Sequence, residues 1–243
     1  MPRIDLNCDL GEGGASDAEL MRWVTSVNIA CGAHAGDGET MRRAAELAVQ
    51  AGVAIGAHPG YEDRSHFGRR ELELEPSAIE DLVARQFDAL RSIAPVRHLK
   101  PHGALYNQAA RDPEIAESIV RAVVAIDRRV ILFGLAGSCL LSAGRAEGLT
   151  VASEVFADRA YENDGSLTPR NRNDALLADV DAALVQVRQM VKLGTVTSRE
   201  GRVIPVQADT VCVHGDELRA LELTRRLRES LEADGIELGP PER

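Results

Sequence analysis

The chain has 243 residues, of which 44% are hydrophobic and 3% aromatic, and its formal net charge is −10. This length suits one α/β barrel or two small domains. The negative charge argues against nucleic acid as a main partner, because a phosphate backbone requires a basic face. No apolar run approaches the ~18 residues of a membrane span, and the N-terminus lacks the basic start and apolar stretch of a signal peptide. We therefore predict a cytoplasmic protein without a membrane or nucleic-acid partner.

Strand-like and helix-like segments alternate along the whole sequence. Seven apolar runs predict strands near residues 3–8, 25–30, 53–57, 96–100, 130–135, 150–154 and 210–213, with helices between them. These runs are apolar on both faces, which is typical of parallel strands covered on both sides. Seven such units without a break in composition favour a single β/α-barrel domain over residues 1–243, with 237–243 as a flexible tail.

An open doubly wound sheet is the alternative architecture. That fold usually carries a glycine-rich phosphate loop after its first strand, and Gly11-Glu-Gly-Gly14 has neither the glycine spacing nor the helix that such a loop requires. The sequence contains no Walker-type nucleotide loop either. The barrel is therefore favoured, with a small hairpin inserted over residues 194–205 that turns at Glu200-Gly201.

Three helix starts carry capping signals. Pro76 is expected in the first turn of its helix, where Ser77 with Glu80 predicts a capping box. Asp112-Pro113 predicts an N-cap followed by proline in the first helical position. Asp216 predicts the N-cap of the final helix, which Gly235 ends, and it is expected to lie behind His214.

Polar and ionisable residues follow nearly every predicted strand. In chain order they are Asn7 and Asp9, Asn28 and His34, His58, Lys100 and His102, Glu154, and His214. The carboxyl ends of parallel strands converge on one face of an α/β protein, where chemistry is assembled. The pattern therefore predicts one site built from six separate segments.

The first strand carries three polar residues on one side. Alternation places Asp5, Asn7 and Asp9 together, and in a barrel that side is the interior. Buried carboxylates need partners, which we expect to be lysine, arginine, histidine or a metal; an exposed strand edge is the alternative. The sequence has no H-E-x-x-H or H-x-H pair, so a metal would require separated ligands, for which Asp9, His34 and His58 are candidates.

Lysine is rare in this sequence. It contains 26 arginines and only two lysines, Lys100 and Lys192. The ammonium group of lysine is compact, and its surroundings can shift its pKa, unlike that of the guanidinium group of arginine. Lys100 is therefore predicted to be functional. His102 alternates onto the same side, and Tyr106 follows one turn later.

A long polar loop follows residue 154. It carries Asp158, Arg159 and Arg170, and it could close over the site as a lid or form a solvated surface loop. His66 and His98 lack such a context and are expected to be structural. The four cysteines form no C-x-x-C pair, so we expect buried thiols, with Cys31 in its polar loop as the exception to examine.

The sequence resembles the LamB/YcsF family over almost its whole length. The motifs that carry the resemblance are Asp5-Leu-Asn-Cys-Asp-Leu-Gly-Glu12, Asn28-Ile-Ala-Cys-Gly-Ala-His-Ala-Gly-Asp37, Gly56-Ala-His-Pro-Gly-Tyr61, Phe67-Gly-Arg-Arg70, Lys100-Pro-His-Gly-Ala-Leu-Tyr-Asn107, Glu154-Val-Phe-Ala-Asp-Arg-Ala-Tyr161 and Cys212-Val-His-Gly-Asp216. The resemblance implies an irregular seven-stranded β/α barrel of the glycoside hydrolase/deacetylase type. It also implies ATP-dependent hydrolysis of 5-oxo-L-proline to L-glutamate, together with partner subunits B and C.

As a hypothesis of our own, we assign roles to the polar residues at the strand ends and in the loop after residue 154. The expected catalytic residues are Asp9, Glu12, His34, Lys100 and His102. The expected substrate-binding residues are Asn7, Asn28, His58, Tyr106, Glu154, Asp158, Arg159, Arg170 and His214. Lys100 and Arg159 would hold carboxylate or phosphoryl oxygens, and Asp9 or Glu12 would handle protons together with a histidine. The complex is expected to consume ATP together with magnesium. The residues leave open whether this chain binds a metal of its own, and which metal that is.

Two other functions fit the residues. A stand-alone metal-dependent deacetylase or amidohydrolase on the same barrel would act without ATP or partners and would lose activity with chelators. A non-catalytic carrier would bind a small acid without turnover. The density of ionisable groups at strand ends disfavours the carrier, because binding alone rarely requires so many.

Overall fold

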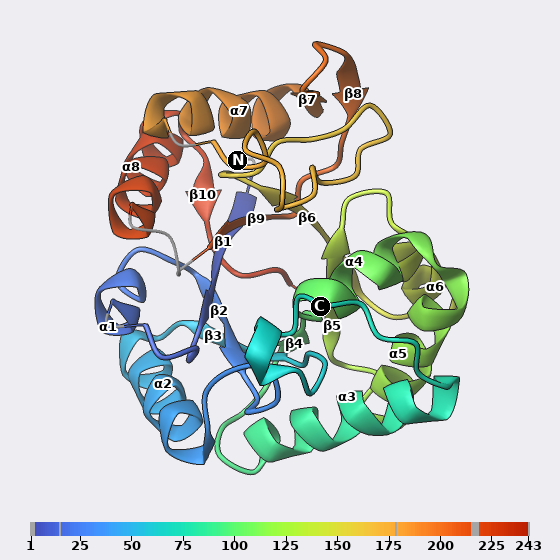
Figure 1. Ribbon diagram of the computed structural model, residues 1–243. Helices are drawn as coiled ribbons and strands as arrows, with labels where there is room; N and C mark the ends of the chain where they lie inside the picture. Colours follow the sequence, from blue (N-terminus) through green and yellow to red (C-terminus); the bar gives the residue numbers. More distant parts are fainter. Residues whose placement is uncertain (1–2, 15, 178, 215–218, 243) are drawn as a thin grey trace.

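The computed structural model describes residues 3–14, 16–177, 179–214 and 219–242. Seven parallel strands close a barrel around which the helices pack (Figure 1). The seven strands are β1 (Arg3–Leu10), β2 (Ser26–Ala30), β3 (Ala54–His58), β4 (His98–Leu99), β5 (Ile131–Leu135), β6 (Val151–Phe156) and β9 (Thr210–His214). They pair in the order β1-β2-β3-β4-β5-β6-β9, and a further pairing of β9 with β1 closes the ring. All seven predicted strands are confirmed, and so is the barrel.

Helices connect successive strands on the outside of the barrel. They are α1 (Asp17–Leu20), α2 (Gly38–Ala51), α3 (Pro76–Arg91), α4 (Gly103–Arg111), α5 (Pro113–Ile126), α6 (Cys139–Ala146), α7 (Val180–Leu193) and α8 (Ala220–Ala233), with a short 3-10 helix η1 (Arg64–His66) before α3. None of the helices in the described ranges combines the length and the apolar character that a membrane span requires.

One helix start confirms its prediction and one does not. The Asp112 carboxylate accepts hydrogen bonds from the backbone N–H groups of Glu114 and Ile115, so it caps α5 as expected. The capping box at Ser77 is wrong, because Pro76 occupies the first turn of α3 and makes Glu75 the N-cap, without a side-chain bond. The expected cap at Asp216 lies outside the described residues.

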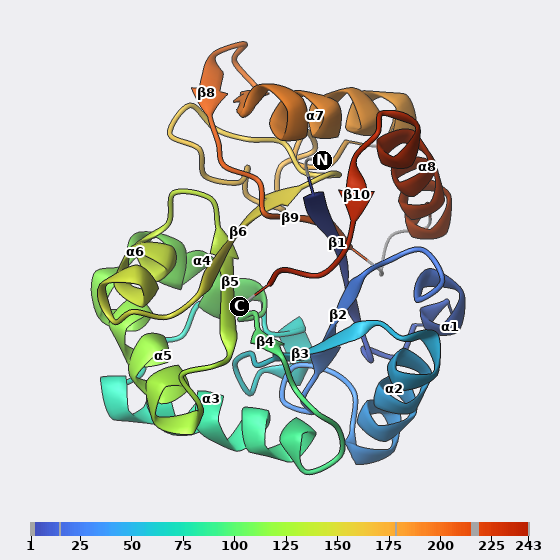
Figure 2. The same ribbon diagram turned by 180° about the vertical axis from the view of Figure 1, so that it is seen from behind.

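The structure confirms the predicted hairpin but not the whole of the predicted flexible tail. β7 (Thr195–Thr197) pairs antiparallel with β8 (Val203–Pro205), which confirms the hairpin. The expected flexible tail is wrong at its start, because β10 (Glu237–Leu238) pairs in parallel with β1, and the backbone N–H of Gly239 donates to the Ile4 carbonyl. Figure 2 shows the chain after β10 running toward the centre of the barrel.

Around β1 to β4 the inside of the barrel is mostly polar and its outside is apolar, while Ile131, Phe133 and Ala152 of β5 and β6 form a small apolar cluster beside the inward His98. Along β1, Ile4, Leu6, Cys8 and Leu10 belong to the hydrophobic core under the helices. The alternate residues point inward and form layers with their neighbours; Asp9 lies beside Asn28, Asn28 beside Gly56, and Gly56 beside His98. A Cβ atom at Gly56 would overlap the His98 ring, so this glycine makes room for the imidazole.

Candidate active site

A pocket of about 1030 Å³ opens at the carboxyl ends of the barrel strands. Every barrel strand except β2 contributes to its lining, either directly or through the loop that follows it. Nine of the predicted site residues belong to this lining: Asp9, Glu12, His58, Lys100, His102, Tyr106, Arg159, Arg170 and His214. The prediction that the strand ends meet in one place is therefore correct.

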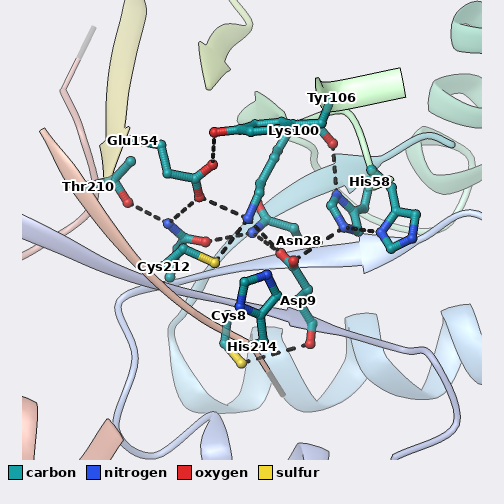
Figure 3. Close-up of polar contacts among 12 residues, drawn as sticks. Cys8, Asp9, Asn28, His58, Lys100, Tyr106, Glu154, Thr210, Cys212 and His214 are labelled. Carbon is teal, nitrogen blue, oxygen red and sulfur yellow. Dashed lines mark hydrogen bonds and ion pairs between the residues drawn. The ribbon is translucent and has the colours of Figure 1, made fainter. Parts of the chain in front are cut away.

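Lys100 lies at the floor of the pocket and is only 2% exposed (Figure 3). Its ammonium nitrogen lies 2.9 Å from Asp9 Oδ1, 2.8 Å from Glu154 Oε1 and 3.1 Å from Cys212 Sγ. Burial would lower the pKa of Lys100, but the Asp9 carboxylate and its neighbours raise it well above the usual value. Lys100 is therefore a fixed cation, and its three donors are engaged by protein atoms rather than directed at a ligand.

Asp9 is the carboxylate that this cation holds toward the pocket. Its Oδ1 accepts hydrogen bonds from Lys100 and from the Asn28 amide at 2.8 Å, while Oδ2 lies 3.5 Å from His58 Nε2. Burial acts to raise the pKa of Asp9, and the charges of His58 and Lys100 outweigh it, so the pKa lies well below its usual value. The Asp9 carboxylate is consequently ionised at neutral pH.

Glu154 is fully buried behind this pair. It accepts hydrogen bonds from the Tyr106 hydroxyl at 2.7 Å and from the Asn7 amide at 3.0 Å, in addition to Lys100. The Asn28 amide bridges Asn7 and Asp9. The network thus satisfies the inward polar groups around the buried cation.

Asp5, one layer deeper, has partners of an unexpected kind. Its carboxylate accepts hydrogen bonds from the hydroxyls of Thr25, Ser26 and Thr210 at 2.6–2.7 Å, rather than pairing with a cation or a metal. Burial outweighs these hydrogen bonds and raises the pKa of Asp5 to about 6. The expected charged partner is therefore a correct prediction for Asp9 and a wrong one for Asp5.

Three histidines and a glutamate form a second cluster on the wall of the pocket. His34, His58 and His102 are buried, and one ligating atom of each lies within 4.8 Å of the others and of a Glu12 carboxylate oxygen. The His34 and His102 rings stack with their centroids 3.7 Å apart. This group contains two of the predicted metal candidates, His34 and His58, but not Asp9.

His214 reaches the pocket from the end of β9 and pairs with an aspartate of the loop after β6. Its Nδ1 lies 2.9 Å from Asp158 Oδ2, and its ring stacks on Phe156. Asp158 keeps a lowered pKa, because the His214 charge and hydrogen bond outweigh the effect of burial. The Asp158–His214 pair leaves the other ring nitrogen of His214 available to a proton in the pocket.

The loop after β6 forms one side of the pocket. The Arg159 guanidinium is buried, donates to the Thr168 carbonyl at 2.6 Å, and has an Nε without a hydrogen-bond partner among the described residues. Burial lowers the pKa of Arg159 to about 10, and the charge of Arg170 adds to the effect. An anion bound here would relieve both costs.

Five predicted site residues lie behind the lining instead of in it. They are Asn7, Asn28, His34, Glu154 and Asp158. Each contacts a lining residue or the partner of one, so we assign them to positioning rather than to substrate contact.

Three neighbours of the site were not predicted. Cys212 and Thr210 face inward on β9, and the Phe156 ring centroid lies 5.3 Å from Lys100 Nζ. Alternation from His214 along β9 is the signal that could have identified Cys212 and Thr210.

The residues expected to be structural lie away from the pocket. His98 is buried and bonds to Asn28, and burial lowers its pKa to about 3, so the ring is neutral. His66 pairs with Asp63 at the surface. Cys31 is buried, its Sγ contacts the Ile29 carbonyl, and burial raises its pKa to about 12. The Cys31 thiol is therefore unreactive, like the other buried cysteines.

Comparisons with known proteins agree over the full length of the chain. The LamB/YcsF family model matches residues 4–243. A protein named as the A subunit of 5-oxoprolinase, from Geobacillus kaustophilus, is 48% identical, with 100% of this chain and 98% of that protein covered. The protein of the same name from Bacillus subtilis is also 48% identical, with 98% and 96% covered.

Solved structures give the same result for the fold. The lactam utilization protein from Thermus thermophilus is 39% identical, superposes with a TM-score of 0.90, and is matched over 98% of this chain and 99% of its own. A family 4 carbohydrate esterase from Streptomyces lividans is 14% identical with a TM-score of 0.51, over 98% of this chain and 92% of its own, which shows a shared fold only. On the full-length match and these identities, the chain belongs to the LamB/YcsF family.

Proposed function

We propose that this chain is the A subunit of 5-oxoprolinase and that, with partner subunits B and C, it catalyses ATP-dependent hydrolysis of 5-oxo-L-proline to L-glutamate. The observation that carries the proposal is 48% identity, over nearly the whole of both chains, to relatives of that name. The ionised Asp9 held at the floor of the pocket supports it, because ring opening requires a base beside a bound lactam.

The chemistry explains why ATP is consumed. A lactam is stabilised by resonance, so its carbonyl carbon is a poor electrophile. Transfer of a phosphoryl group from ATP to the carbonyl oxygen releases ADP and activates that carbon. Water then adds to the carbon, and the carbon–nitrogen bond breaks while the nitrogen takes up a proton, which leaves an acyl phosphate. A second water releases phosphate from it, so the sum consumes one ATP and two waters for each glutamate.

The residues of this chain suit the proton transfers in that sequence. Asp9 can accept a proton from the attacking water, and Lys100 keeps it ionised until then. His214, oriented by Asp158, is placed to carry a proton toward the departing ring nitrogen. The carboxylate of 5-oxoproline would bind beside Arg159 and Arg170.

The supply of ATP belongs to the same proposal. We assign its consumption, with magnesium, to the complex of three subunits rather than to a nucleotide loop in this chain. An ATP-dependent reaction also favours the cytoplasm, where ATP is made available.

The decisive assay measures glutamate released from 5-oxoproline by this chain alone, then with ATP, and then with subunits B and C added. Release is expected only in the third arm. Turnover with ATP and this chain alone would contradict the role of the partners.

Asp9→Asn tests the site within that assay. Loss of the carboxylate should lower kcat by about 100-fold or more, because a positioned base contributes roughly 10²–10⁴. The matched control is Asp5→Asn, which alters another inward aspartate of β1 that does not line the pocket. Near-normal turnover by Asp9→Asn would remove Asp9 from the mechanism.

A second candidate is a stand-alone metal-dependent deacetylase or amidohydrolase. The buried cluster of three histidines and Glu12 favours it, because imidazole and carboxylate ligands hold the metals that such hydrolases use. It predicts amide hydrolysis in the first arm of the assay, without ATP, and inhibition by chelators.

A further inference from the structure

One contact between two histidines of the cluster cannot be a hydrogen bond if both rings are neutral. His58 Nε2 and His102 Nδ1 lie 2.9 Å apart. The opposite nitrogens lie against backbone carbonyls, with His58 Nδ1 2.8 Å from the oxygen of Lys100 and His102 Nε2 2.9 Å from the oxygen of Phe67. A carbonyl oxygen only accepts, so both outer nitrogens carry protons. With both rings neutral the two inner nitrogens would direct lone pairs at each other, so a cation must lie between them. It is either a metal ion or a proton on His58, which the Asp9 carboxylate 3.5 Å from His58 Nε2 would favour.

Two more donors point to the same space. Glu12 Oε1 lies 3.0 Å from His34 Nε2 and 3.5 Å from His102 Nδ1. Tetrahedral ligands that are each 2.0–2.1 Å from a zinc ion are roughly 3.3 Å apart. The observed separations of 2.9, 3.0 and 3.5 Å lie on both sides of that value, and the other ligand atoms lie within 4.8 Å of one another. Because the His34 and His102 rings are stacked, His34 would tilt out of the stack to complete the geometry.

A proton shared by His58 and His102 is the alternative cation. It would engage one pair of nitrogens, whereas a third imidazole and a carboxylate converge on the same space. His34 is moreover 1% exposed, and its Nε2 is the ring nitrogen that faces Glu12. A metal ion uses all four side chains and gives the burial of His34 a purpose.

The cluster is also held as a metal site should be. The carbonyls of Lys100 and Phe67 fix two of the rings, which is how ligating histidines are commonly oriented. Gly60 and Gly68 leave room for His34, because an added Cβ would lie 2.9 Å from His34 Nδ1 and 2.8 Å from His34 Cβ respectively. His58 and His102 are therefore held in place, and His34 has space beside them.

Asp9, Cys212 and His214 form the other group with metal-like spacing, but a cation is already present there. The Lys100 ammonium contacts both Asp9 and Cys212, and Asp158 engages His214 Nδ1. A second positive charge beside Lys100 would be repelled. We therefore leave Asp9, a candidate from the sequence, outside the proposed set of ligands.

We infer that Glu12, His34, His58 and His102 bind one divalent transition-metal ion, for which zinc is the best match. Imidazole nitrogens with a single carboxylate suit zinc, whereas magnesium and calcium prefer oxygen ligands. Glu12, His58 and His102 line the pocket, so an ion here would supply Lewis-acid chemistry to a bound carbonyl or water. The site goes beyond the 5-oxoprolinase proposal, which does not require a metal in this chain.

The test is zinc binding by the full chain on its own, without ATP, 5-oxoproline or other subunits. Protein stripped with a chelator is titrated with Zn²⁺ by calorimetry, and cobalt substitution reports the ligand geometry in the visible spectrum. We expect one ion per chain. Loss of a ligand in His58→Ala or His102→Ala should weaken binding by about 100-fold or more, since even outer-shell changes cost 10–100-fold.

Two further variants keep the test decisive. His66→Ala is the matched control, because His66 pairs with Asp63 outside the cluster, and it should bind zinc as the parent chain does. Glu12→Gln preserves the side-chain shape and should weaken binding even if the histidine variants fail to fold. Absence of stoichiometric zinc in the parent chain, or unchanged affinity in Glu12→Gln, would overturn the site. Either result is independent of the glutamate assay, so each proposal can fail without the other.

Discussion

Asp5 illustrates the cost of placing a carboxylate among hydroxyls instead of cations. Its pKa is about 6 in the folded chain and 3.8 when exposed, because burial disfavours the ionised form. The folded state therefore binds the proton more tightly than the unfolded state. The stability that this adds is complete below about pH 4 and is lost as pH rises through 6, a total of about 3 kcal/mol.

Asp5→Asn should remove that dependence. Between pH 5 and pH 8 the parent chain should lose about 1 kcal/mol more unfolding free energy than the variant, as measured by urea denaturation at each pH. Parallel pH profiles for the two chains would show that Asp5 does not take up a proton in this range in the folded protein.

Individual partners were the least predictable part of the site. The sequence placed Asp9, His58, Lys100 and His214 at strand ends, and the closed barrel brings them together. The sequence could not show that His214 would pair with Asp158 rather than with a residue close to it in the chain, because the pair joins β9 to the loop after β6. Contacts between the ends of neighbouring strands, here β6 and β9, depend on register, which local patterns do not encode.

Among the elements, the start of α4 depends on one glycine. Gly103 has a φ of +55°, and an added Cβ would lie 2.6 Å from the Gly68 carbonyl oxygen. Gly103→Ala should lower the unfolding free energy by about 2–4 kcal/mol. About 1 kcal/mol or more of this comes from the left-handed backbone, and the rest comes from the overlap of the new Cβ with the Gly68 carbonyl oxygen.

Gly148→Ala provides the matched comparison. Gly148 has a φ of +74° with open space around its Cβ position, so this variant should carry the strain alone. Thermal denaturation of both variants then separates the two costs. Equal losses of stability would mean that the loop at Gly68 yields to the new methyl group.

Elements were predicted well wherever the pattern was long. α2, α3, α7 and the barrel strands carry apolar stripes or runs that reveal them. β10 escaped prediction because two residues cannot show a period, and its position is decided by the free edge at the start of β1. Pro76 was predicted correctly in the first turn of α3, and the capping box failed because this start makes Glu75, and not Ser77, the N-cap.

At the scale of the whole molecule, the C-terminal segment lies at the end of the barrel where β1 begins, opposite the pocket at the carboxyl ends of the strands. A chain that ends at Ile236 would leave Arg3 and Ile4 of β1 without their partners in β10. We expect the unfolding free energy to fall by about 1–3 kcal/mol, from lost backbone hydrogen bonds and exposed apolar surface.

Urea denaturation measures that loss, with a chain that ends at Pro241 as the control because it retains β10. A midpoint equal to that of the full chain would show that the β10 pairing adds nothing to stability. The architecture itself was predictable, since seven apolar runs and their connections leave few alternatives. The single-domain organisation over residues 1–243 stays a prediction.

The seclusion of Lys100 also gives the chain a built-in reporter. Its two side-chain amines differ sharply: Lys192 on α7 is 44% exposed, while Lys100 is 3% exposed in the floor network. An acylating reagent that modifies Lys192 in the native protein can react with the Lys100 amine only when the ion pairs of Lys100 with Asp9 and Glu154 open. The ratio of the two modified peptides in a digest therefore measures the rate of that opening, with Lys192 as the internal standard.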